Sequence, residues 1–154
     1  MMSSVLITDL RQLEFADMYA AAQVHRAAFD QAMPWLIGLH TPDEDRRFYR
    51  EHVFKAASLW GAFDGETLAG LIAFHDGWIE QLYVLPKAQG CGIGSKLLDV
   101  AKRAADRLQL WTFQRNVTAR RFYQANGYVE DGLLAGKFGT RSSYAMWKPL
   151  LEKS

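Results

Sequence analysis

The chain has little cysteine and little net charge. Its 154 residues include a single cysteine, Cys91, which excludes an internal disulfide and any structural metal site built from cysteines. Eighteen Lys and Arg residues stand against 17 Asp and Glu residues, a formal net charge of +1 at pH 7. The basic residues are scattered along the chain, so the composition indicates neither a nucleic-acid partner nor a membrane surface. No metal is expected.

Long apolar runs are also missing. No segment approaches the roughly 18 apolar residues of a membrane-spanning helix. The first residues, Met1-Met2-Ser3-Ser4, show no basic region that leads into an apolar signal segment. Apolar and charged contents of 49% and 23% are typical of globular proteins. We therefore expect a soluble, cytoplasmic protein with a single domain over residues 1–154.

Hydrophobic periodicity predicts alternating strands and helices. The predicted strands cover residues 5–11, 58–64, 67–75, 78–85, 108–114, 128–134 and 142–148. The predicted helices cover residues 16–30, 42–55, about 93–107 and 117–125. The order β-α-α-β-β-β-α-β-α-β-β predicts a mixed α/β sheet with helices on both of its faces.

Turn and cap signals support these boundaries. Asp64-Gly65 and Asp76-Gly77 are strong signals for tight hairpins between antiparallel strands. Thr41, Pro42 and Glu44 are typical of a helix start, with Thr41 as N-cap and Glu44 completing a capping box. Asn126-Gly127 is typical of a helix end.

The most informative segment is residues 80–94, where an apolar strand turns through Gly90, Gly92 and Gly94 into a helix. The first turn of a helix exposes unpaired N–H groups and the positive end of the helix dipole, so this junction predicts a phosphate-binding site. The spacing does not fit a P-loop, because Lys96 follows Ser95 instead of preceding it. The spacing also lacks the third glycine of the dinucleotide-binding pattern Gly-x-Gly-x-x-Gly. That pattern follows an early strand of a βαβ unit, whereas this turn follows a meander of antiparallel strands.

Two motifs resemble signatures of the GNAT superfamily of CoA-dependent N-acyltransferases. Residues 89–94, Gln-Gly-Cys-Gly-Ile-Gly, match the family's acyl-CoA-binding pattern Gln/Arg-x-x-Gly-x-Gly/Ala. Residues 116–128 match its second pattern, Asn-x-x-Ala-x-x-Phe-Tyr-x-x-x-Gly-Phe/Tyr. The resemblance extends over about residues 5–150. It implies the GNAT fold, with a mixed, mostly antiparallel sheet of about seven strands, and it implies acetyl-CoA as the acyl donor.

The resemblance also implies which residues hold the acyl donor. The backbone amides of the turn would bind the pyrophosphate, and the strand before it would pair with the pantetheine through the backbones of Leu82 and Val84. Gln89 either reaches the same phosphate oxygens or is a solvated loop residue, and Asn116 either bonds the pantetheine or caps the next helix. The full cofactor-binding set is Leu82, Tyr83, Val84, Gln89, Gly90, Cys91, Gly92, Ile93, Gly94, Ser95, Asn116 and Tyr123.

Two residues are candidates for catalysis. The resemblance implies that Tyr123 lies near the thioester sulfur and protonates the departing thiolate. Glu80 is the candidate base. Some members of the family carry a catalytic glutamate at this position and others carry one near the start of the next strand, where residues 111–113 of this chain include no carboxylate. Strand alternation predicts that Glu80 shares a face with Leu82 and Val84. The alternative interpretation of Glu80 is a strand carboxylate that orders the substrate or faces solvent. We interpret Cys91 as a small filler beside the cofactor, since no partner base is identifiable for it.

The amine acceptor is expected to contact the regions that vary within the family. We predict contacts from Trp35, His40, Trp78 and Phe113, with Tyr49 and Arg141 as further candidates. The predicted reaction transfers an acetyl group to a primary amine of a small molecule or peptide by direct attack in a ternary complex. The alternative is a noncatalytic acyl-CoA-binding module. A homodimer is a further expectation, because the fold leaves strand edges exposed.

Overall fold

A computed structural model describes residue 7, residues 9–135 and residues 143–149, with side chains described up to residue 130. The described residues form a seven-stranded sheet in the order β1-β2-β3-β4-β5-β7-β6. Its strands are β1 (Asp9–Gln12), β2 (Ser58–Asp64), β3 (Thr67–His75), β4 (Trp78–Val84), β5 (Gln109–Phe113), β6 (Tyr128–Ala135) and β7 (Ser143–Pro149). The predicted number of strands and their order along the chain are confirmed.

The helices cover both faces of the sheet, as predicted. They are α1 (Met18–Ala32), α2 (Pro42–Arg47), α3 (Phe54–Ala56), α4 (Ile93–Ala104) and α5 (Val117–Ala125). One buried cluster joins the sheet to α4 and α5 and includes Ile72, Leu97 and Tyr123. A second cluster, which includes Met18 and Tyr49, joins the opposite face to α1 and the segment after α2. Apolar residues of β3 contribute to both clusters, because successive side chains of a strand point to opposite faces.

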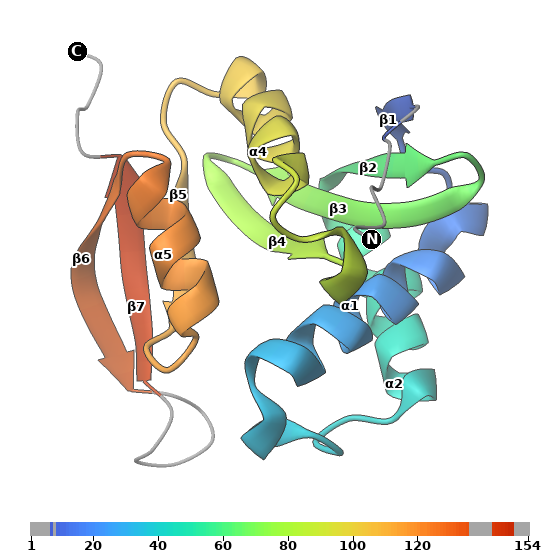
Figure 1. The fold of residues 1–154 in the computed structure, drawn as a ribbon, viewed down its shortest axis with the longest axis horizontal. Coiled ribbons are helices and arrows are strands. Elements are labelled where there is room, and N and C mark those ends of the chain that lie inside the picture. Colours follow the sequence, from blue (N-terminus) through green and yellow to red (C-terminus); the bar gives the residue numbers. More distant parts are fainter. Residues whose placement is uncertain (1–6, 8, 136–142, 150–154) are drawn as a thin grey trace, which may run out of the picture.

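Only one pair of neighbouring strands in this sheet is parallel. β4 and β5 run in the same direction, because the chain returns through α4 before it forms β5. Figure 1 shows β1–β4 on the right and β5, α5, β6 and β7 on the left, with the ribbons of β4 and β5 diverging downward. The parallel junction therefore divides the sheet into two halves.

The turn chemistry behaves as the sequence predicts. Asp76 and Gly77 both have positive φ, +50° and +79°, which matches the right-handed twist of the β3–β4 hairpin. The Thr41 hydroxyl accepts a hydrogen bond from the Glu44 amide at 3.1 Å, and the Glu44 carboxylate accepts one from the Thr41 amide at 2.9 Å. This confirms the predicted capping box.

Most predicted boundaries lie within two residues of those in the structure, and three elements differ more clearly. The first strand covers Asp9–Gln12, whereas part of the predicted range 5–11 lies outside the described residues. The predicted helix 42–55 contains a π-helical segment at Phe48–Val53 between α2 and α3. Helix α4 ends at Ala104 rather than near residue 107, because Ala105 adopts an extended conformation that leads the chain into β5.

Candidate functional site

The glycine turn has the backbone that the sequence predicts for an anion site. Gly90 and Gly92 have φ of +80° and +81°, a left-handed conformation that residues with a Cβ rarely adopt. Gly92 is the N-cap of the twelve-residue helix α4. The unpaired amides of that helix's first turn, with the positive end of its dipole, therefore lie at the end of this loop.

The strands on either side of this turn separate. In the described residues, β4 and β5 pair only at Trp78 with Gln109 and at Ile79 with Leu110. On its other edge β4 pairs with β3, where Val84 is opposite Gly70 and Tyr83 is opposite Leu71. From Glu80 to Val84, the edge of β4 toward β5 therefore makes no ladder hydrogen bonds with β5 and can pair with an extended ligand.

A cavity of about 510 Å³ lies along this end of β4 and is also lined by α1, the glycine turn and α5; its volume is within the usual range of small-molecule sites. The structure brings together most of the predicted cofactor-binding residues around it. Those that line it are Leu82, Tyr83, Val84, Gln89, Gly90, Gly92, Ile93, Gly94, Ser95, Asn116 and Tyr123. Cys91 does not line it; this residue is exposed, with its Sγ 3.8 Å from the Gln89 carbonyl oxygen.

The cavity also has lining residues that the sequence did not indicate. They are Ala28, Gln31 and Ala32 of α1, Ala88 before the turn, and Thr118, Ala119, Arg121 and Phe122 of α5. The second motif places α5 beside the cavity, so helical spacing from Asn116 and Tyr123 could have indicated its other lining residues. No pattern in the sequence indicates the contribution of α1, which depends on how that helix crosses β4.

Comparisons with known proteins agree with this geometry. Residues 55–130 match the family model described as an acetyltransferase (GNAT) domain. These residues form a GNAT acetyltransferase domain. The peptidyl-lysine N-acetyltransferase YiaC of Escherichia coli is 30% identical over 80 residues, which are 51% of this chain and 55% of YiaC. The chain thus matches little more than half the length of this curated relative.

Solved structures of GNAT proteins share the whole fold. The apo form of YjaB from Escherichia coli has a TM-score of 0.77 at 19% identity and covers 91% of this chain and 95% of YjaB. The structure of yncA from Salmonella typhimurium, solved with its cofactor acetyl-CoA, has a TM-score of 0.68 at 20% identity and covers 95% of each chain. The predicted GNAT fold is confirmed.

Tyr123 lies on the cavity wall of this GNAT domain, with only 6% of its surface exposed. Burial raises the pKa of its phenol well above the usual value, and the neighbouring Tyr83 and Tyr128 raise it further. The ring of Tyr123 packs edge-on against Tyr128, with 5.6 Å between ring centroids. The hydroxyl is therefore protonated at neutral pH and is a weaker acid than the hydroxyl of a solvent-exposed tyrosine.

Glu80 lies where β4 and β5 begin to separate. It is the extra residue of a β-bulge, since Ala73 pairs with Gln81 and Phe74 pairs with Ile79. The bulge breaks the predicted alternation of Glu80 with Leu82 and Val84, because an extra residue shifts the facing of a strand. Ile79 packs in the same cluster as Leu82 and Val84, whereas Glu80 is exposed and does not line the cavity.

The Glu80 carboxylate has a specific partner. His75 Nε2 lies 2.8 Å from Glu80 Oε1, and His75 Nδ1 lies 3.1 Å from Asp76 Oδ2. The hydrogen bond with Asp76 and the negative charges of Asp76 and Glu80 raise the pKa of the His75 imidazole. A histidine held between two carboxylates thus fixes the position of Glu80.

Two polar side chains of the cavity have structural roles. The Gln89 amide donates a hydrogen bond to the Val84 carbonyl at 2.9 Å, which ties the turn back to the end of β4. Asn116 Oδ1 accepts a hydrogen bond from the Ala119 amide at 3.1 Å, so Asn116 is the N-cap of α5. Both residues also line the cavity.

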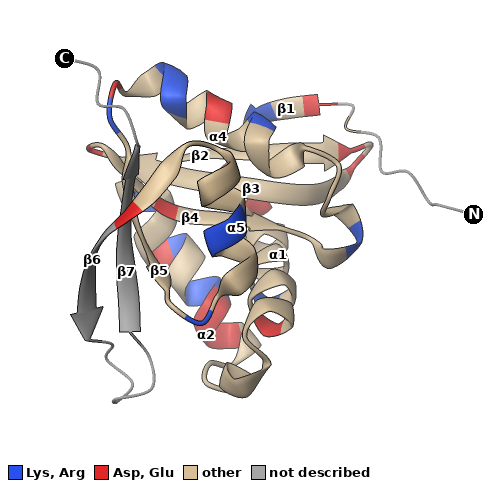
Figure 2. Ribbon diagram, turned by 60° about the vertical axis from the view of Figure 1, so that its left-hand side comes forward, with Lys and Arg blue, Asp and Glu red and all other residues tan. Residues whose placement is uncertain are grey.

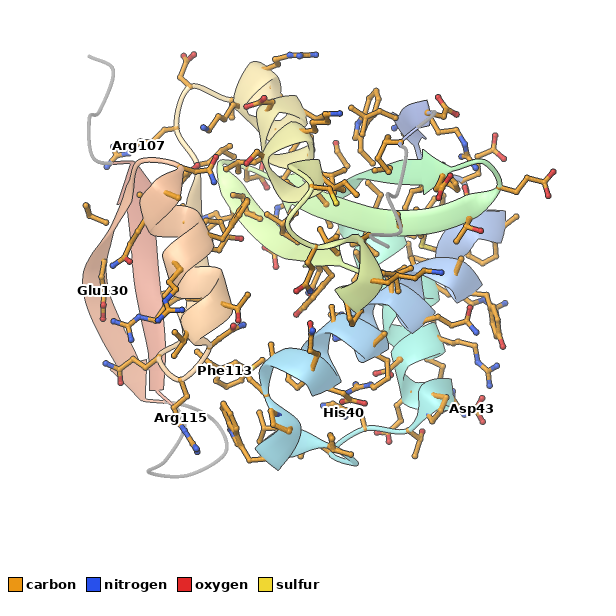
Figure 3. All side chains as sticks on the ribbon, viewed as in Figure 1. His40, Asp43, Arg107, Phe113, Arg115 and Glu130 are labelled. Carbon is orange, nitrogen blue, oxygen red and sulfur yellow. The ribbon has the colours of Figure 1, made fainter. Side chains whose placement is uncertain are left out.

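The predicted acceptor residues lie outside the cavity lining, in aromatic contacts beside it. Trp78 stacks on Trp111 with ring centroids 6.1 Å apart, and Phe113 packs edge-on against Phe29 at 6.2 Å. The Arg115 guanidinium lies 3.9 Å from the centroid of the Trp35 ring, an exposed cation–π contact. Figure 3 shows Phe113 and Arg115 together, near the C-terminal end of α1.

Three acceptor candidates lack support from this geometry. Tyr49 is fully buried and its hydroxyl lies 2.8 Å from His25 Nδ1, so it is a core residue. His40 is exposed, and its Nδ1 lies 3.6 Å from Glu44 Oε2; Figure 3 shows it apart from Phe113 and Arg115. Arg141 lies outside the described residues.

No group of three or more His, Cys, Asp and Glu side chains among the described residues could hold a metal ion. No helix within the described ranges has the length and apolar character needed to span a membrane.

Proposed function

We propose that this chain is an acetyl-CoA-dependent N-acetyltransferase that acetylates a primary amine of a small molecule or peptide. The observation that carries the proposal is the cavity along the end of β4, where that strand no longer pairs with β5 in the described part of the chain; the cavity joins an extended strand edge to a glycine turn at a helix N-terminus. A ligand that fits both parts has an anionic group at one end and an extended amide-bearing arm at the other. Acetyl-CoA is such a ligand.

The residues present fit that ligand. The amides between Gly90 and Ser95 would hold the diphosphate without a charged side chain. Among the described residues, the edge of β4 toward β5 has no ladder pairs with β5 beyond Ile79, and there the backbones of Leu82 and Val84 would hydrogen-bond the amides of the pantetheine arm. When bound, acetyl-CoA supplies a thioester whose carbonyl carbon is the electrophile.

Tyr123 and Glu80 would carry out the two proton transfers of the reaction. The C–N bond to the acceptor forms as the C–S bond breaks. Glu80 would receive the proton that the amine loses, through a bridging water, since its carboxylate lies outside the cavity wall. The Tyr123 hydroxyl would give its proton to the leaving sulfur, and a backbone N–H near Val84 would stabilise the carbonyl oxygen.

The proposed acceptor is a primary amine, and the assay must identify the class of molecule that carries it. YiaC is described as a peptidyl-lysine N-acetyltransferase, so peptides with a free lysine belong in the test beside small amines. A noncatalytic acyl-CoA-binding module is the competing outcome. A cytoplasmic location and a homodimer stay predictions.

The test combines binding and turnover. Calorimetry with acetyl-CoA should show one site, and an assay of released thiol over a panel of amines and lysine peptides should show acetyl-CoA-dependent turnover. Gly92→Ala should weaken binding at least about tenfold, because a Cβ disfavours the left-handed conformation that the turn requires. Gly65→Ala is the matched control, since Gly65 has φ of +61° in the β2–β3 turn.

Each outcome has a defined meaning. Binding without turnover on every acceptor would favour the noncatalytic module. Absence of acetyl-CoA binding by the folded protein would refute the proposed function.

A further inference from the structure

The cavity is almost free of charged side chains. Among its described lining residues, Arg121 is the only Lys, Arg, Asp or Glu. Coenzyme A carries a diphosphate and, on its ribose, a separate 3′-phosphate monoester. A phosphate monoester has a charge of about −1.5 to −2 at pH 7. Amides of the glycine turn account for the diphosphate, so the lining offers one cation for the second anionic group.

The two neighbouring arginines of α5, which form the blue segment of that helix in Figure 2, have different environments. Arg120 donates to the Gln114 carbonyl oxygen at 3.1 Å and pairs with Glu130 at 3.4 Å. Arg121 makes no ion pair with any described residue and lies on the cavity side. Successive helix residues point about 100° apart, so Arg120 ties α5 to its own half of the sheet and leaves Arg121 at the cavity.

The position of α5 places its cavity-lining residues, Arg121 among them, in the same cavity wall as the glycine turn. The following residue, Phe122, approaches Gly94 so closely that a Cβ on residue 94 would lie 2.9 Å from the ring. Thr118, one turn before Arg121 on the same helix, also lines the cavity. Arg121 therefore belongs to a helix that contacts the first turn of α4. The residue is exposed and shares the cavity lining with the glycine turn.

We propose that Arg121 binds the 3′-phosphate of coenzyme A and makes the protein select the phosphorylated donor over its dephosphorylated form. This inference rests on the proposed use of acetyl-CoA. A guanidinium suits the role, since it stays charged at all working pH values and can donate two parallel hydrogen bonds to one phosphate.

The experiment measures binding of two donors by calorimetry at low salt. The donors are acetyl-CoA and acetyl-dephospho-CoA, which lacks only the 3′-phosphate. The wild-type protein should bind acetyl-CoA about tenfold more tightly, as expected for a charged hydrogen-bonded pair. Arg121→Gln should lose that preference and bind both donors as the wild type binds acetyl-dephospho-CoA. Arg103→Gln, in the last turn of α4 and outside the cavity lining, is the matched control and should retain the preference.

The other results separate the possible failures. If Arg121→Gln weakens both donors equally, Arg121 contacts the diphosphate and the inference is wrong. If the variant binds both donors as the wild type does, Arg121 contacts neither phosphate and the inference is also wrong. If the wild-type protein binds neither donor, the proposed function itself fails.

Discussion

Gly94 of α4 lies against the ring of Phe122 of α5, so that a Cβ at residue 94 would be 2.9 Å from Phe122 Cε1. Both residues line the cavity. This contact sets how closely the two helices approach on one side of the anion site. A glycine is required there for space, since Gly94 is not among the glycines with positive φ.

Gly94→Ala should therefore destabilise the fold. Overpacking costs about 1–3 kcal/mol, and the gain in helix propensity of about 1 kcal/mol offsets part of it. We expect a net loss of about 1 kcal/mol in the free energy of unfolding, measured by urea titration, and weaker acetyl-CoA binding. In a Phe122→Leu background, which lacks the ring, Gly94→Ala should lower neither the free energy of unfolding nor the affinity for acetyl-CoA. If Gly94→Ala is as stable as the wild type and binds as well, the helix contact is not a constraint.

Tyr123→Phe should lower kcat about 100-fold, the usual contribution of a general acid. The change removes one hydroxyl from a buried ring, so the affinity for acetyl-CoA should stay within about twofold. Tyr128→Phe is the matched control, because its ring contacts that of Tyr123 but does not line the cavity. An unchanged kcat in Tyr123→Phe would refute the proton-donor role.

Glu80→Gln should lower kcat/KM about 100-fold, because it removes the proposed base. His75→Gln should have a smaller effect, since it removes the partner 2.8 Å from the carboxylate but leaves the base. Glu66→Gln, in the β2–β3 turn, controls for the loss of one negative charge. A kcat/KM of Glu80→Gln that matches the wild-type value would exclude Glu80 as the base.

His25 should make the fold sensitive to acid. It packs among the rings of Phe29, Tyr49 and Tyr83, and burial lowers the pKa of its imidazole from 6.5 to about 4. The unfolded chain binds this proton near pH 6.5 while the folded chain does not, so stability falls as the pH drops from 6.5 toward 4.

This effect should cost about 2 kcal/mol of unfolding free energy between pH 7 and pH 5, as measured by urea titration at both values. His25→Gln keeps a hydrogen-bonding partner for Tyr49 and should reduce the loss by that amount. His52→Gln, an exposed histidine, should show the same loss as the wild type. An equal pH dependence in wild type and His25→Gln would show that another group is responsible.

Local chemistry in the sequence determined much of the fold. The hairpin at Asp76-Gly77, the capping box at Thr41 and the helix over residues 117–125 each depend on residues within a few positions of one another. The glycine turn is of the same kind, because its left-handed conformations are properties of single residues. The resemblance of residues 89–94 and 116–128 to the GNAT signatures then implied the GNAT fold and most of the cavity lining.

Tertiary structure alone decided the features that depend on how distant elements meet. The bulge at Glu80 arises from the register of β4 against β3, and it changes which face a predicted base occupies. Packing between helices and sheet placed Tyr49 in the core and Ala28, Gln31 and Ala32 in the cavity wall. The sequence shows Arg120 and Arg121 as a pair of equal charges. Only the fold gives Arg120 a partner at Glu130 and leaves Arg121 at the cavity, because partners that lie on other elements are not encoded in local spacing.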